Sequence, residues 1–204
     1  MYLIHYGTKG QKWGVRRYQN PDGTYTEEGK RRRQSQYTSE VTTSIATSIK
    51  KRDLEGMSKS IGEVNKRYLS QDQIKRLSEA SWKTAKLDRK IDSIQEDAMN
   101  YANNHPSVID KYGNFDDDKW IDLANGYMDK HGYTEIYNQL ESSAKSYRNE
   151  CKKVADELLG DIGKNTTITL KQKNQEAKLD IPSIVSENLA GLNYRSRDGK
   201  WIVY

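Results

Sequence analysis

The sequence predicts a mainly α-helical fold: an elongated helical bundle of heptad-patterned antiparallel helices, with small β-hairpin elements at the N- and C-termini. Three observations lead to this fold class. Hydrophobic residues make up 34% of the 204 residues and charged residues 31%, which indicates a thin core. The chain contains three prolines, so long uninterrupted helices can form. Two long stretches carry apolar residues that alternate between spacings of three and four.

The first 34 residues are predicted to form strands and turns. Asn20-Pro21-Asp22-Gly23 is a strong turn signal, because Pro presets φ and Gly accepts a left-handed conformation. Residues 12–18 and 24–26 can pair across this turn as a hairpin. A hairpin alone is only marginally stable in water, so we expect it to dock on the helices or on a partner.

The middle of the chain is predicted to be helical. Apolar residues mostly three or four apart indicate one or two helices over residues 38–69. Ser70 and Gln73 form a capping-box pattern that starts the next helix, and His105-Pro106 ends it.

Two more helices follow a predicted loop at residues 107–115. A short helix spans residues 116–130 and Gly132 closes it. Thr134 is expected to cap a long helix whose apolar stripe runs from Tyr137 to Leu158. This stripe can pack antiparallel against the stripe at residues 87–101 as an intramolecular core, with a coiled-coil dimer or a partner groove as the alternative.

The period changes after Gly160. Residues 166–170 are strand-like, residues 182–192 predict a short helix, and residues 194–204 predict a second hairpin. The outline of that hairpin, Tyr-x-x-x-Asp-Gly-x-Trp, is similar to the outline of residues 18–25. The pattern divides the chain into a basic N-terminal strand and turn module (1–34), a helical bundle (35–160) and a small α+β element (161–204).

The sequence predicts no enzyme: no catalytic residue, no metal site and no cofactor. The histidines His5, His105 and His131 are not at metal-ligand spacing with other ligands. Cys151, the single cysteine, falls on the apolar stripe and is expected in the core. Asp116-Asp117-Asp118 suits the first turn of a helix, where the dipole favours negative charge.

The net positive charge is confined to one end of the chain. Residues 1–33 hold eight Lys and Arg against three acidic residues, so they carry the whole net charge of +5. The run Lys30-Arg31-Arg32-Arg33 is interpreted either as a solvated linker or as a segment that binds phosphates or an acidic protein face. No apolar run is long enough to span a membrane, and Met1-Tyr2-Leu3-Ile4 is too short for a signal-peptide core.

Residues 5–31 read HYGTKGQKWGVRRYQNPDGTYTEEGKR. This stretch resembles a module of tailed-phage and prophage proteins with the pattern His-x-Gly-x-x-Gly-Gln-Lys-Trp-Gly-Val-Arg-Arg-Tyr-Gln-Asn-x-Asp-Gly-x-x-Thr-x-x-Gly followed by basic residues. In such proteins the module is joined to unrelated sequences, often head-morphogenesis or virion-associated proteins. The resemblance implies a location in the host cytoplasm or in the virion.

Three hypotheses follow. The first is a non-enzymatic, virion-associated structural, cargo or assembly protein that docks on a protein partner through the module. We expect the partner-binding residues to be Lys12, Trp13, Arg16, Arg17 and Tyr18, with Asn20, Pro21, Asp22 and Gly23 shaping the turn.

The second hypothesis is a phage inhibitor of a host defence system, such as an anti-CRISPR protein, that acts by covering a protein surface. The balanced charge of residues 34–204 argues against DNA mimicry. The third is a nucleic-acid-binding accessory protein that uses Lys30 to Arg33 with Arg16 and Arg17.

Overall fold

The computed structural model describes residues 18–172, 175–197 and 200–204, and it is mainly helical with two antiparallel strand pairs. The predicted fold class is thereby confirmed. The chain forms two compact units, and each combines distant parts of the sequence. The first holds the described residues up to 69 together with residues 152–189, and the second holds residues 70–151 together with 190–204. The sequence pattern, in contrast, divides the chain into three consecutive segments.

In the first unit, helix α1 (Glu27–Lys51) starts earlier than the sequence predicts. The Thr26 hydroxyl oxygen accepts a hydrogen bond from the Gly29 amide at 3.1 Å, and Glu27 and Glu28 complement the positive end of the helix dipole. The expectation of strand and turn up to residue 34 is therefore wrong for residues 27–34. The run Lys30–Arg33 lies on the first turns of a helix, so it is no linker.

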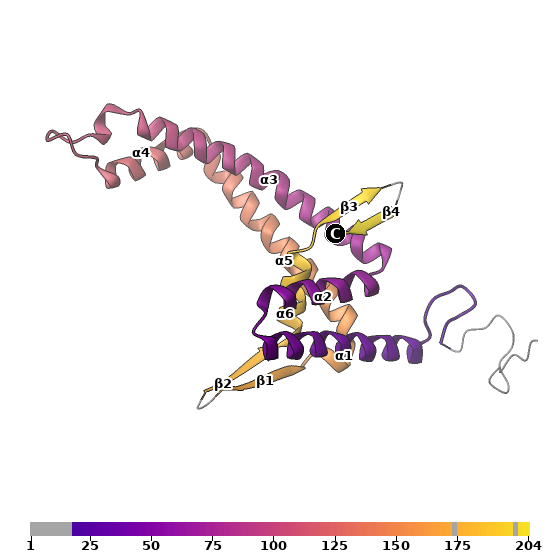
Figure 1. Ribbon diagram of the computed structural model, residues 1–204. Coiled ribbons are helices and arrows are strands. Elements are labelled where there is room, and N and C mark those ends of the chain that lie inside the picture. The colour runs from indigo at the N-terminus through magenta and orange to yellow at the C-terminus, as the bar shows by residue number, and fades with distance from the viewer. Residues whose placement is uncertain (1–17, 173–174, 198–199) are drawn as a thin grey trace, which may run out of the picture. The chain divides into compact units, whose positions relative to one another are not determined.

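A tight break separates α1 from α2 (Leu54–Tyr68), so the predicted helical region consists of two helices. Arg52 adopts a left-handed conformation with φ 56°, and its amide donates to the Ile49 carbonyl at 3.0 Å. The Asp53 carboxylate then caps α2 by accepting from the Gly56 amide at 2.8 Å. The two helices pack side by side (Figure 1).

The core of this unit contains a polar network among apolar side chains. The Tyr37 hydroxyl donates to Asn65 Oδ1 at 2.5 Å, and Asn65 Nδ2 donates to Asn188 Oδ1 at 2.9 Å. Asn188 Nδ2 donates in turn to the Ser58 carbonyl at 2.9 Å. The network therefore joins α1, α2 and α6 (Ile181–Ala190). The buried apolar residues around it are Val41, Ile45, Ile61, Val64, Val154, Leu159, Ile181, Val185 and Leu189.

Strands β1 (Thr167–Gln172) and β2 (Gln175–Asp180) form an antiparallel hairpin before α6, with Thr167 opposite Asp180. The predicted strand at residues 166–170 is confirmed as β1, and the predicted helix at 182–192 as α6. Strand β2 was not predicted because its sequence, QEAKLD, lacks alternating apolar residues and is extended only through pairing with β1.

In the second unit, α3 (Gln71–Asn103) and the first part of α5 (Tyr133–Gly163) run antiparallel (Figure 1). Arg76 and Glu150 form an ion pair at 2.5 Å, and the Thr84 and Ser143 hydroxyls lie 3.3 Å apart. The predicted antiparallel pairing is confirmed for the part of α5 up to residue 151, whereas residues 152–158 of the predicted stripe belong to the first unit. Buried residues along the two helices are Ile74, Leu77, Ile91, Ile94, Ala98, Ala102 and Cys151.

The helix caps predicted at Ser70 and Thr134 can be compared with the structure. The capping box of α3 is present: the Gln73 amide donates to Ser70 Oγ at 3.2 Å, and the Ser70 amide donates to Gln73 Oε1 at 2.9 Å. Helix α5 begins at Tyr133, so Thr134 lies inside the helix and is not its cap. Its hydroxyl instead donates to the Asp129 carboxylate of the preceding helix.

The predicted C-terminal hairpin is confirmed as β3 (Tyr194–Arg197) and β4 (Lys200–Val203), and it packs against α3. Arg197 pairs directly with Lys200. The similar outline of residues 18–25 gives a different structure. The predicted N-terminal hairpin consists, in its described part, of one bridge between Gln19 and Tyr25, and residues 12–17 lie outside the described part of the chain.

A short 3₁₀ turn, η1 (Pro106–Val108), leads through a bridge between Ile109 and Phe115 into α4 (Asp117–Lys130). Helix α4 packs on α3, and Trp120 Nε1 donates to Asn103 Oδ1 at 2.8 Å. No side chain of α4 is fully buried. Gly132 follows the C-cap residue His131 and has φ 69°, which confirms its predicted closing role.

Candidate protein-binding groove

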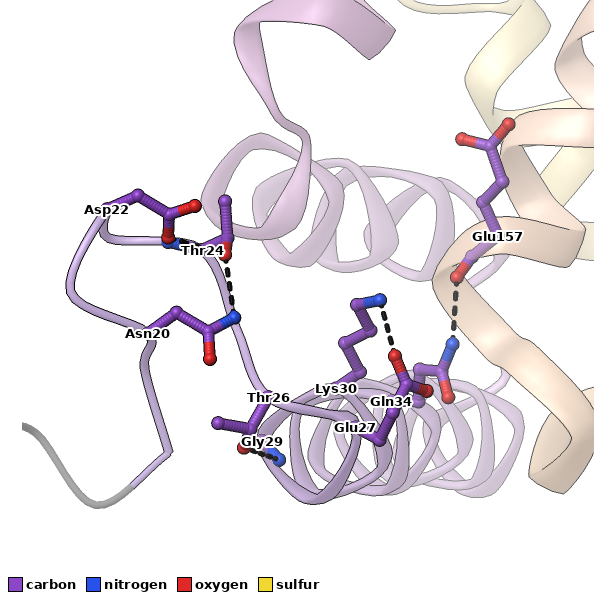
Figure 2. Close-up of polar contacts among 9 residues, drawn as sticks. All are labelled: Asn20, Asp22, Thr24, Thr26, Glu27, Gly29, Lys30, Gln34 and Glu157. Carbon is purple, nitrogen blue, oxygen red and sulfur yellow. Dashed lines mark hydrogen bonds and ion pairs between the residues drawn. The ribbon is translucent and has the colours of Figure 1, made fainter.

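Residues 19–25 form a tight turn held by its own polar groups (Figure 2). The backbone amide of Asn20 donates to the Thr24 carbonyl at 2.7 Å. Gly23 has φ +84°, in the left-handed region that glycine adopts readily. The Asp22 carboxylate accepts from the Thr24 hydroxyl at 2.7 Å and from the Thr24 amide at 2.9 Å. The hydrogen bonds from the Thr24 side chain and backbone lower the pKa of Asp22. The turn signal in the sequence is thereby accounted for.

The turn docks on the first turn of α1 through Tyr18 and Gly29. The Thr26 amide donates to the Tyr18 carbonyl at 3.0 Å, which brings the two ends of the segment together. Gly29 is buried, and a Cβ at this position would lie 2.3 Å from the Tyr18 carbonyl oxygen. Glycine is therefore required here because the backbone of Tyr18 crosses directly over the helix.

An open groove of about 570 Å³ lies between this turn, α1 and the end of α2. We call it the tyrosine–arginine groove. Its composition, rich in tyrosine and arginine, is that of residues that anchor protein interfaces. The lining residues are Tyr18, Tyr25, Gly29, Arg32, Arg33, Gln36, Glu40, Arg67 and Tyr68.

The two arginines of α1 are held in place by tyrosines. The Arg33 guanidinium lies 4.8 Å from the centre of the Tyr68 ring and 5.4 Å from that of Tyr25. Its Nη2 donates to the Tyr68 carbonyl at 2.8 Å. The Arg32 guanidinium lies 4.5 Å from the centre of the Tyr18 ring and donates to the hydroxyl of the same residue. Cation–π contacts of this kind favour one orientation of a flexible cation.

Glu40 is the acidic residue of the groove and organises its far edge. Its Oε2 pairs with Arg67 Nη2 at 2.7 Å, and its Oε1 accepts from the Tyr68 hydroxyl at 2.9 Å. Burial, followed by the hydrogen bond to Glu40, raises the pKa of Tyr68. Since Arg67 and Glu40 neutralise each other, the positive character of the groove comes from Arg32 and Arg33.

The start of α1 is also tied to α5. Gln34 Nε2 donates to the Glu157 carbonyl at 3.2 Å (Figure 2). This contact lies where α5 departs from helical geometry, at Gly160 with φ 57° and ψ −161°. The helix that carries the arginines is therefore anchored on the face of α5 as well as on α2.

The predicted partner-binding residues lie in different parts of the chain with respect to the groove. Lys12, Trp13, Arg16 and Arg17 lie outside the described residues. Tyr18 lines the groove, whereas the residues from Asn20 to Gly23 shape the turn and are exposed.

The basic run Lys30–Arg33 is divided by its place on the helix. Arg32 and Arg33 line the groove. Lys30 pairs with Glu27 at 2.7 Å, and Arg31 is exposed. The structure therefore separates two groove residues from two residues of the same run that do not line it.

Sequence reasoning missed the residues that complete the groove: Tyr25, Gly29, Gln36, Glu40, Arg67 and Tyr68. A helix predicted from residue 27 onward would have indicated some of these residues, because positions 29, 32, 33, 36 and 40 share one helix face. Arg67 and Tyr68 join the groove through tertiary packing of α2, and their local sequence carries no signal for it.

Other chemistry-bearing residues serve the fold. Cys151 is buried, and burial raises the pKa of its thiol to about 11, which disfavours the nucleophilic thiolate. His131 caps α4 with Nδ1 2.8 Å from the Tyr127 carbonyl, and His105 Nδ1 accepts from the Ser107 amide at 3.3 Å. Within the described ranges, no group of three or more His, Cys, Asp or Glu could hold a metal ion.

Comparisons with protein-family models, with curated proteins and with solved structures found no match to this chain. Among the helices of the described residues, none is both long enough and apolar enough to cross a membrane.

Proposed function

We propose that this chain is a non-enzymatic interaction protein of a tailed phage or prophage, and that it docks on a protein of the virion or of its assembly through the tyrosine–arginine groove. The observation that carries this proposal is the pair Arg32 and Arg33, each fixed over a tyrosine ring and each facing an open groove. Arginine and tyrosine in such a setting are typical anchors of protein interfaces.

The groove has the features of a binding surface. It is lined by cations and rings, with one carboxylate that is already paired with Arg67. Its polar groups are held before binding, so a partner loses little side-chain entropy on docking. The resemblance to the phage module adds support, because Tyr18 and Gly29, two residues of that pattern, both line the groove and lie in close contact there.

Particle composition tests the first part of the proposal. We expect mass spectrometry of purified particles to find the chain as a constituent. Its absence from particles would contradict a virion-associated role.

Affinity capture with variants tests the groove. The Arg33→Ala and Tyr25→Ala variants should lose the partner that the wild-type chain captures from an infected lysate. A matched control is available in the second unit, where Lys86 lies 5.3 Å from the ring centre of the exposed Trp82. The Lys86→Ala and Trp82→Ala variants should retain the partner. Capture of a host nuclease or defence effector in place of a phage protein would favour the inhibitor hypothesis instead.

A further inference from the structure

The tyrosine–arginine groove has a complementary surface on the same chain, in the second unit. Residues 109–122, IDKYGNFDDDKWID, hold five Asp and two Lys, and we call them the acidic segment. We propose that the acidic segment of one copy binds in the tyrosine–arginine groove of a second copy. This inference rests on the proposed function for the groove as a protein-binding surface, and it names the partner.

Charge is the first match between the two surfaces. Residues 27–33 hold four basic and two acidic residues, and Lys30 is already paired with Glu27, so Arg31, Arg32 and Arg33 provide the excess positive charge. The acidic segment presents exposed carboxylates at Asp117, Asp118 and Asp122. Arginine binds carboxylates through paired hydrogen bonds, which gives both affinity and orientation.

Ring exposure is the second match. Phe115 is 50% exposed and Tyr112 77% exposed, next to the aspartates. In the groove, Tyr25 is 37% exposed and its ring lies beside Arg33. An aromatic ring inserted into a groove of rings and guanidinium groups gains both stacking and cation–π contacts.

The local shape of the acidic segment suits insertion. It begins with the turn at residues 109–115, which forms one end of its unit (Figure 1). The Asp110 carboxylate holds that turn by accepting from the Tyr112 and Asn114 amides, both at 2.8 Å. Because α4 buries none of its side chains completely, part of its surface is available to a second molecule.

A short acidic segment fits the groove better than a nucleic acid does. Glu27 and Glu28 are exposed on the first turn of α1, and Glu40 lies in the groove itself. A continuous chain of phosphates would pass these carboxylates, whereas a few aspartates can reach the arginines and avoid them. A groove on one copy and a segment on the next make a heterologous contact, which produces rings or open head-to-tail chains.

Sedimentation velocity of the nuclease-treated full chain tests the proposal. We expect a weight-average mass that rises with protein concentration at low salt. The mass should fall toward that of the monomer near 1 M salt, where the screening length is about 3 Å. The double variants Arg32→Gln/Arg33→Gln and Asp117→Asn/Asp118→Asn should each associate roughly thirtyfold more weakly, as expected for interface anchors.

Mixing the two double variants gives the sharpest result. The first retains its acidic segment and the second retains its groove, so the mixture should form one-to-one heterodimers and nothing larger. The double variants Lys50→Gln/Lys51→Gln and Asp88→Asn/Asp92→Asn remove the same charges from exposed positions elsewhere, and they should associate as the wild type does.

Three outcomes would overturn the proposal: a wild-type chain that is monomeric at all concentrations, an association unchanged in both groove and segment variants, or an association that nuclease treatment abolishes. A monomeric chain that still binds particles would reject this inference and leave the proposed function intact. Loss of particle binding with intact self-association would do the reverse.

Discussion

Two turns of this chain, residues 19–25 before α1 and residues 109–115 before α4, have the same backbone hydrogen bonds at a separation of 90 positions. In both, a bridge closes the turn, and the next residue caps the helix. The equivalent bonds have nearly equal lengths. They are Asn20 to Thr24 at 2.7 Å and Asp110 to Asn114 at 2.8 Å, Gly23 to Asn20 and Gly113 to Asp110 at 3.0 Å, and Thr26 to Tyr18 at 3.0 Å and Asp116 to Val108 at 2.8 Å.

The side chains around the two turns differ. Gly29, Arg32 and Arg33 after the first turn correspond to Lys119, Asp122 and Leu123 after the second. The second turn starts a helix with neither a buried glycine nor arginines at these positions. These residues are therefore not needed to start a helix after such a turn. Gly29, Arg32 and Arg33 line the groove, and the residues at the equivalent positions of the second turn are of other types.

The helices that the two turns start also differ in anchoring. Helix α1 contributes Tyr37 to a buried polar network, whereas α4 buries no side chain completely. The same local device thus precedes a firmly packed helix in one unit and a partly covered helix in the other. The following predictions test this comparison.

The largest effect is expected at Asn65, which anchors α1. The substitution Asn65→Ala leaves the buried Tyr37 hydroxyl and the side-chain oxygen Oδ1 of Asn188 without their partner, so we expect a loss of about 2–4 kcal/mol in unfolding free energy. Chemical denaturation measures it. Tyr37→Phe should lower the unfolding free energy less in the Asn65→Ala variant than in the wild type. Equal losses in the two proteins would contradict the network.

Substitution of Gly29 should have a larger effect on stability than substitution at the equivalent position after the second turn. The substitution Gly29→Ala places a Cβ against the Tyr18 carbonyl, so we expect about 1–3 kcal/mol of destabilisation together with loss of groove binding. Lys119→Ala, at the equivalent position of the second turn, should change stability by less than about 0.5 kcal/mol. Similar losses in the two variants would show that the turns dock alike.

Substitution of Gly23 or of Gly113 by Ala should lower stability by equal amounts. Their φ angles are +84° and +86°, and a Cβ at either position would meet nothing within 4 Å. Each substitution to Ala should therefore cost about 1–2 kcal/mol, the cost of placing an L-residue in the left-handed region. Thermal unfolding of both variants checks the equality, and a clear difference would mean that one turn is held by more than its backbone.

The smallest effect concerns the turn carboxylates. Hydrogen bonds from Thr24 lower the pKa of Asp22, and those from Asn114 lower the pKa of Asp110. A lowered pKa in the folded state contributes stability above the unfolded value of 3.8, and this stability is lost as the pH falls through the folded pKa. NMR titration should place both pKa values below 3.8. A pKa at or above 3.8 for either residue would mean that its carboxylate does not accept the hydrogen bonds of the turn.

The sequence by itself determined much of the local structure of this chain. The turn at residues 20–23, the capping box at Ser70, the helix end before Pro106 and the C-terminal hairpin are all set by hydrogen bonds between residues close in sequence. The alternating stripes of α3 and α5 likewise predicted their antiparallel pairing, because burial of a stripe requires a partner stripe. Signals of this kind are readable because the interacting groups lie within a few positions of each other.

Tertiary structure alone decided which residues form the groove. Arg67 and Tyr68 belong to α2 and reach Arg33 and Glu40 only because α2 folds back along α1. The division into two units, with α5 contributing to both, also depends on contacts between distant segments. The local sequence of a segment does not specify which distant segment it packs against, because that choice depends on the apolar area that the whole chain buries.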